Sequence, residues 1–122
     1  MTYSSKTVLV LEDQPLVALD IEDVLMQFGF ESIKVISSCI DAEHWLKHSS
    51  PDIAIIDIHL RDGICSHVAW MLADSAIPFI VHSALGTHFS GDGSVFEKGR
   101  WINKPSVPDQ LRLAVTETLE AP

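Results

Sequence analysis

Three carboxylates in this sequence stand directly after apolar runs that have the character of buried strands. Glu12 and Asp13 follow Thr7–Leu11, and Asp57 follows Ile53–Ile56. A charge at the end of a buried strand costs several kcal/mol unless something pairs with it. Carboxylates that converge also repel one another. We therefore expect a cation among them, and Mg²⁺ suits them best because it takes one or two carboxylates together with water and phosphate oxygens.

Two further polar residues end or follow later apolar runs. Ser83 ends the run Ile77–Ser83, and Lys104 follows Arg100–Asn103. A hydroxyl and an ammonium group can hold the oxygens of a phosphoryl group while Mg²⁺ neutralises the rest of its charge. An Asp carboxylate in such a site is a competent nucleophile. These residue types therefore point to an aspartyl-phosphate at Asp57. A zinc site is disfavoured, because the pair Asp57 and His59 has no second His or Cys cluster at ligand spacing.

The elements that must position these residues alternate along the chain. Strands are predicted at Thr7–Leu11, Ser32–Ile36, Ile53–Ile56, Ile77–Ser83 and Arg100–Asn103. Helices are predicted from Pro15 to a stop at Gly29, around Ala42–Leu46, near Val68–Ala73, and from Pro108 onward. In the last helix, Ser106 and Asp109 are the predicted capping pair, and the predicted buried residues are Leu111, Val115 and Leu119. A loop is predicted directly after Asp57. The segment Leu85–Gly99 has four glycines and only scattered apolar residues, so it predicts a helix only weakly.

This alternation predicts an α/β fold: a five-stranded parallel sheet of order 2-1-3-4-5 with helices on both faces. Such sheets bind ligands at the carboxyl ends of their strands, where the strand order reverses. In this order the reversal lies between the first and third strands. Glu12, Asp13 and Asp57 should therefore meet at one edge of the sheet.

Composition and net charge limit the classes of partner that this chain can bind. The 122 residues predict one domain spanning 1–122, with 47% hydrophobic residues and a net charge of −9. That charge disfavours nucleic acid and anionic membranes and favours cations or basic proteins. A polar start and short apolar runs predict a cytoplasmic protein without a membrane span. Cys39 and Cys65 form no CxxC motif, so we expect reduced thiols that serve as packing residues.

These motifs together resemble the receiver domains of two-component response regulators, over the whole chain. The family has an acidic pair, a phosphoacceptor Asp, a Ser or Thr before a small residue, and Lys-Pro, each after successive strands. Here they read Glu12-Asp13, Asp57, Ser83-Ala84 and Lys104-Pro105.

The resemblance implies a flavodoxin-like fold and phosphorylation of Asp57 by a sensor histidine kinase or phosphotransfer protein. It implies Mg²⁺ on Asp13, Asp57 and the His59 backbone carbonyl, with Glu12 acting through water. It implies phosphoryl contacts from Ser83, Ala84 and Lys104, a switch made of Ser83 and Trp101, and output through contact with a downstream protein. No enzymatic activity is implied beyond the domain's own phosphoryl transfer and dephosphorylation.

The segment after the phosphoacceptor departs from the family pattern. Arg61 stands where most receivers have Pro, and Gly63 comes early, so the loop is shortened. This resembles receivers found as single domains or attached to sensor kinases. Trp101 is larger than the Tyr or Phe that usually occupies the switch position. Both a packing role and a switch role therefore stay open for its side chain.

The same residues allow other functions. A pseudo-receiver that binds partners without phosphorylation stays open as the alternative function. A flavodoxin-like cofactor binder is disfavoured because the acidic Glu12-Asp13 turn would repel a phosphate. A haloacid-type phosphatase would need an Asp where His59 stands. His59, His82 and His88 are predicted as surface or strand-end residues, and Trp45 and Trp70 as helix packing residues.

Overall fold

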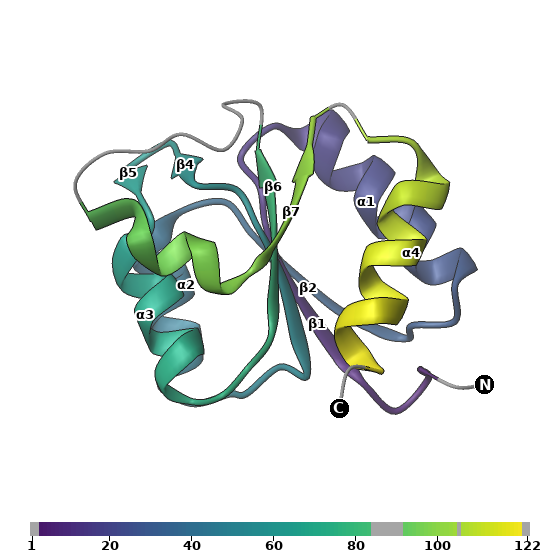
Figure 1. Ribbon diagram of the computed structural model, residues 1–122, viewed down its shortest axis with the longest axis horizontal. Helices are drawn as coiled ribbons and strands as arrows, with labels where there is room; N and C mark the ends of the chain where they lie inside the picture. The colour runs from purple at the N-terminus through teal and green to yellow at the C-terminus, as the bar shows by residue number, and fades with distance from the viewer. Residues whose placement is uncertain (1–2, 84–91, 105, 121–122) are drawn as a thin grey trace.

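The computed structural model describes residues 3–83, 92–104 and 106–120, and it shows a central sheet with helices on both faces (Figure 1). The strands of the sheet are β1 Thr7–Leu11, β2 Ser32–Ile36, β3 Ile53–Ile56, β6 Phe79–Ser83 and β7 Arg100–Asn103. The helices are α1 Pro15–Gln27, α2 Cys39–Leu46, α3 Ser66–Asp74, the 3₁₀ helix η1 Asp92–Lys98, and α4 Pro108–Leu119.

The sheet is parallel and has the order β2-β1-β3-β6-β7. This confirms the predicted order 2-1-3-4-5, since two short strands, β4 His59–Leu60 and β5 Gly63–Ile64, pair only with each other. β3 lies in the centre with all four residues fully buried, which explains its unbroken apolar sequence.

Alternate residues of the central strands supply two cores, one on each face of the sheet. Val10 and Ile55 pack with residues of α1 and α4, such as Leu25 and Leu111. Their neighbours along β1 and β3 point the other way, toward α2, α3 and η1. In Figure 1, α1 and α4 cover one face of the sheet while α2, α3 and η1 cover the other.

The segment after Asp57, predicted as a loop, is a hairpin. β4 and β5 pair antiparallel, with His59 opposite Ile64 and Leu60 opposite Gly63, so Arg61 and Asp62 form the turn. Gly63 has φ +127°, a conformation that favours glycine. At the base of the hairpin, the Cys65 N–H donates to the Ile58 carbonyl oxygen at 2.9 Å. The shortened segment is therefore ordered by its own backbone bonds.

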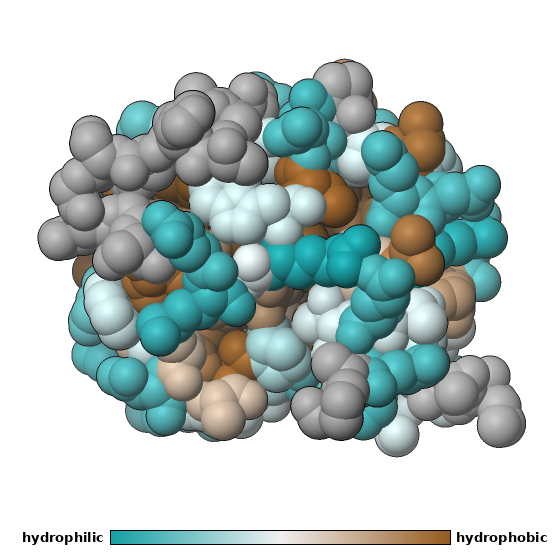
Figure 2. Space-filling view, viewed as in Figure 1, coloured by the Kyte–Doolittle hydropathy of each residue, from teal (hydrophilic) through white to brown (hydrophobic). Residues whose placement is uncertain are grey.

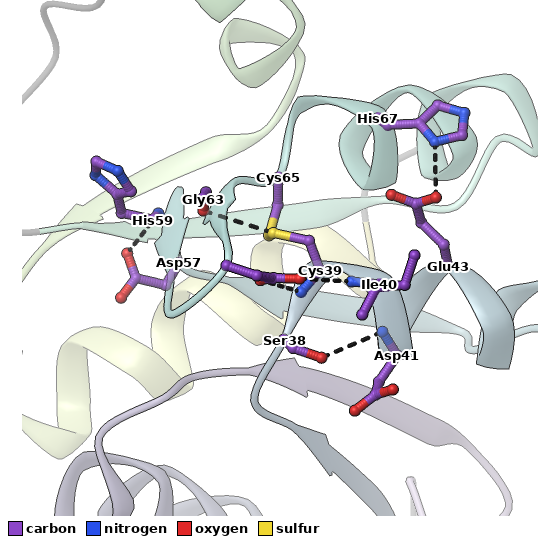
Figure 3. Close-up of a disulfide and its surroundings, with 11 residues drawn as sticks. Ser38, Cys39, Ile40, Asp41, Glu43, Asp57, His59, Gly63, Cys65 and His67 are labelled. Carbon is purple, nitrogen blue, oxygen red and sulfur yellow. Dashed lines mark hydrogen bonds and ion pairs between the residues drawn. A yellow bond between two sulfur atoms is a disulfide. The ribbon is translucent and has the colours of Figure 1, made fainter.

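The prediction of two reduced cysteines is wrong: Cys39 and Cys65 form a disulfide with 5.4 Å between their Cα atoms (Figure 3). Cys39 is the first residue of α2, and Cys65 directly precedes α3. The two are 26 residues apart in sequence. They meet because the hairpin folds back against the start of α2, which the spacing of the cysteines does not reveal.

Three local predictions also need correction. β6 begins at Phe79 rather than Ile77, in keeping with Pro78 having no N–H for the strand ladder. Helix α4 has Val107 as its N-cap instead of the pair Ser106 and Asp109, and the Val107 N–H donates to the Gln110 side-chain oxygen at 3.1 Å. Trp70 is 41% exposed and so is no packing residue.

Much of the weakly encoded segment predicted at Leu85–Gly99 lies outside the described residues, as do Ala84, His88 and Pro105. Its last part is η1, whose Val95 and Phe96 are fully buried in the core. The face seen in Figure 2 is mostly hydrophilic, and its hydrophobic side chains form separate small areas. Within the described parts of the chain, every helix is too short or too polar to span a membrane.

Candidate functional site

The predicted site residues are placed by backbone bonds that extend the sheet by one residue past its strands. The Glu12 N–H donates to the Ile36 carbonyl and the Asp57 N–H to the Leu11 carbonyl, both at 3.1 Å. The Lys104 N–H donates to the Ser83 carbonyl at 3.0 Å. Strand pairing alone thus brings residues from distant parts of the sequence to the same edge of the sheet.

Lys104 joins two of the carboxylates. Its ammonium Nζ lies 2.7 Å from Glu12 Oε1 and 2.7 Å from Asp57 Oδ2. Burial by itself would lower the pKa of Lys104, but the hydrogen bonds to Asp57 and Glu12 outweigh it, and the pKa is raised above its ordinary value. Lys104 therefore stays charged and offsets the charge of both partners.

Glu12 is held at both carboxylate oxygens. The residue is 2% exposed, and its Oε2 accepts the Gln14 N–H at 3.1 Å while Oε1 meets Lys104. A buried carboxylate is tolerated when it is paired and hydrogen-bonded in this way. Glu12 thus anchors the lysine and the turn into α1.

The three carboxylates can supply oxygen ligands to a cation. Glu12, Asp13 and Asp57 each offer an oxygen, and these atoms lie within 4.8 Å of one another. The set is all oxygen and partly open, which fits the ligand preference of Mg²⁺. Lys104 balances only part of the negative charge of the three carboxylates, so the residues present fit a divalent cation.

A cleft of about 840 Å³ opens over this edge, between α1 and α4. Its lining includes Asp13, Asp57 and Lys104, and also Ser83, a predicted phosphoryl contact that is 1% exposed. The exposed His59 also lines the cleft, and its backbone N–H donates to Asp57 Oδ1 at 3.4 Å. The structure therefore brings together every predicted metal and phosphoryl residue that it describes; Ala84 lies outside that part.

His82 is a cleft residue whose environment the sequence interpretation missed. It is 4% exposed, and its Nε2 lies 3.0 Å from the Ser106 hydroxyl. Burial, followed by the nearby charge of Lys104, lowers the pKa of His82 to about 4. The strand period could have revealed its burial, because His82 shares a face of β6 with the core residue Ile80.

Trp101, the predicted switch residue, lies on β7 and packs against the core on the α3 side. Its indole N–H donates to the Phe96 carbonyl oxygen in η1 at 2.9 Å. The side chain therefore links the edge strand to η1 instead of lining the cleft.

Comparisons with known proteins found a relative in sequence and solved structures with a similar fold. No family model matches the chain. Chemotaxis protein CheY of Bacillus subtilis is 26% identical over 115 residues, which cover 92% of this chain and 96% of CheY.

Solved structures of receiver domains share the fold. The receiver domain of a Pseudomonas aeruginosa sensor histidine kinase, which has a magnesium ion coordinated in its active-site cleft, has a TM-score of 0.80 at 18% identity, covering 95% of this chain and 98% of that one. A CheY-like receiver domain from Methylobacillus flagellatus has a TM-score of 0.77 at 19% identity, covering 93% and 98%. The chain therefore has the fold of these response-regulator receiver domains, and its sequence is similar to that of CheY over nearly its whole length.

Proposed function

We propose that this chain is a response-regulator receiver domain that accepts a phosphoryl group on Asp57 from a histidine kinase or phosphotransfer protein, with Mg²⁺ as cofactor. The observation that carries the proposal is the position of Asp57. It directly follows the central strand, lies beside Glu12 and Asp13, pairs with Lys104, and lines an open cleft. A nucleophile held in this way is ready to meet a phosphoryl donor that enters the cleft.

In the proposed transfer, a carboxylate oxygen of Asp57 attacks the phosphorus of a phosphohistidine. The new oxygen–phosphorus bond forms as the nitrogen–phosphorus bond breaks, and the departing electron pair stays on the donor imidazole. The Lys104 ammonium and the Ser83 hydroxyl are assigned to the phosphoryl oxygens. Lys104 can serve because it is charged and already within 2.7 Å of Asp57.

Asp13, Asp57 and the His59 backbone carbonyl would hold Mg²⁺ directly, with Glu12 contributing through water. When bound, the ion would shield the repulsion between these carboxylates and the incoming phosphoryl group. The role of Glu12 is secondary on this account, because both of its carboxylate oxygens already accept hydrogen bonds from the protein.

The signal would leave through protein contacts. Ser83 lies at the end of β6, next to β7, which carries Trp101. A charge-assisted hydrogen bond from Ser83 to the phosphoryl group would shift the end of β6, and Trp101 would pass that shift to η1 through its bond to Phe96. A downstream protein would read the altered surface.

Phosphorylation by acetyl phosphate tests the proposal. Intact-mass spectrometry should show one phosphoryl group on the wild-type protein in the presence of Mg²⁺ and none after Mg²⁺ is chelated. Asp57→Asn should accept none, whereas Asp74→Asn, at the exposed end of α3, should behave as wild type. A folded wild-type protein that binds Mg²⁺ but takes up no phosphoryl group would instead be a pseudo-receiver.

A further inference from the structure

The hairpin formed by residues 58–65 follows Asp57 directly and carries His59, whose carbonyl is assigned to the metal. Its interior side is buried, with Ile58 fully buried and Leu60 4% exposed. Its two ends are joined by the bond from the Cys65 N–H to the Ile58 carbonyl at 2.9 Å. A displacement of Cys65 is therefore passed to the residue next to Asp57.

The disulfide ties the C-terminal end of this hairpin, at its base, to α2. Cys65 ends the hairpin segment and Cys39 begins α2, and both residues are buried. Figure 3 shows the disulfide next to the strand segment with Gly63, with Asp57 and His59 beyond it. The covalent link thus joins a helix that supplies no site residue to the segment that follows the phosphoacceptor.

Asp62, in the turn of the hairpin, makes a second tie to the same helix end. Its carboxylate accepts the N–H of Cys39 at 2.8 Å and that of Ile40 at 3.0 Å. These are N-terminal amides of α2, which have no partner within the helix. Both bonds lower the pKa of Asp62, as expected for a carboxylate that the fold holds in its charged form.

We propose that the Cys39–Cys65 disulfide and the Asp62 carboxylate together position the hairpin at the phosphoacceptor site, so that the redox state of the two cysteines sets the Mg²⁺ affinity. This inference rests on the proposed function, because it needs the His59 carbonyl as a ligand. A carbonyl fixed in advance binds the ion without a further loss of backbone freedom. Asp62 is a positioning residue, since it acts through the hairpin.

Reduction by a small dithiol would release the first of the two ties. The dithiol gives two electrons and two protons to the cystine, the sulfur–sulfur bond breaks, and two thiols form while the dithiol becomes a cyclic disulfide. The hairpin keeps its own backbone bonds, and the pair of Asp62 bonds still ties it to α2. Its amides should open more often, and the His59 carbonyl should sample positions away from the metal site.

Titration of the ¹⁵N-labelled protein with Mg²⁺, followed by NMR, tests this proposal. The amide shifts of Asp13 and Asp57 should give a dissociation constant that is several-fold weaker in the reduced protein than in the oxidised protein. Hydrogen exchange of residues 58–65 should be faster in the reduced state. Cys39→Ala/Cys65→Ala should bind Mg²⁺ like the reduced protein with or without the dithiol, which controls for effects of the reagent.

Variants at Asp62 isolate the second tie. Asp62→Ala should weaken Mg²⁺ binding, and Asp62→Asn should restore part of it because the amide oxygen can still accept the helix N–H groups. Asp74→Ala removes an equal charge from an exposed position and should leave the affinity unchanged.

Equal Mg²⁺ affinities in the oxidised and reduced wild-type protein would overturn the proposal, and this comparison does not depend on whether any variant folds. A lack of Mg²⁺-induced shifts at Asp13 and Asp57 in the oxidised protein would overturn the metal site itself, and with it the effect of the disulfide on that site. The two failures are therefore distinguishable.

Discussion

Among individual residues, Lys104 determines the electrostatic state of the site. Its ammonium lies 2.7 Å from carboxylate oxygens of both Glu12 and Asp57, and only 14% of its side chain is exposed. Two carboxylates this close would repel each other without it. The same ammonium lies next to Asp57, where we propose that it contacts the phosphoryl group. One residue would thus stabilise the site both before and after phosphorylation.

His82 gives the protein a pH-dependent stability that can be measured. Its pKa of about 4 in the folded protein lies below the ordinary value of 6.5, so the unfolded chain binds a proton more readily between these values. Stability should therefore fall as the pH drops below 6.5. The loss from this group between pH 7 and pH 5 should be about 2 kcal/mol.

Urea unfolding of the wild type and His82→Gln at pH 7 and pH 5 measures this contribution. The wild type should lose more stability than the variant by the amount given above. An equal loss in both proteins would mean that His82 takes up its proton in the folded state as easily as in the unfolded chain, contrary to its burial beside Lys104.

At the scale of elements, β7 and η1 form the route proposed for the signal. Trp101 on β7 donates to the Phe96 carbonyl in η1 at 2.9 Å and packs against the core, so the two elements are joined by one side chain. In a Trp45→Phe/Trp70→Phe variant, Trp101 is the remaining tryptophan. Adding beryllofluoride, a phosphoryl mimic, with Mg²⁺ should change its emission because its hydrogen bond to η1 shifts.

The same experiment with Asp57→Asn added serves as the control and should show no change in emission. If the emission of Trp101 stays constant while binding of a partner protein changes, Trp101 is a packing residue and the signal leaves by another route.

The elements also show where sequence reasoning succeeded and where it failed. β1 and β3 were predictable because strands buried on both faces must be apolar throughout, and their ends then mark Glu12, Asp13 and Asp57. The β4–β5 hairpin was not predicted, because two-residue strands carry too little pattern to detect. The disulfide was missed for the same reason, since only the fold of the hairpin brings Cys65 to Cys39.

For the whole molecule, parallel topology explains why five polar residues scattered from Glu12 to Lys104 lie at one edge of the sheet. The order β2-β1-β3-β6-β7 places the ends of β1 and β3 side by side and follows them with β6 and β7. The sequence does not reveal which side chains contact one another at this edge, such as Glu12 with Lys104 and His82 with Ser106.

The central claim is that Asp57 carries the phosphoryl group, and chemical trapping tests it most directly. The protein is incubated with acetyl phosphate and Mg²⁺ and then treated with borohydride, which reduces an aspartyl phosphate to homoserine. Tandem mass spectrometry of the digested protein should find homoserine at position 57 and unmodified Asp13. An unmodified Asp57 together with homoserine at another Asp, or no homoserine at all, would contradict the account.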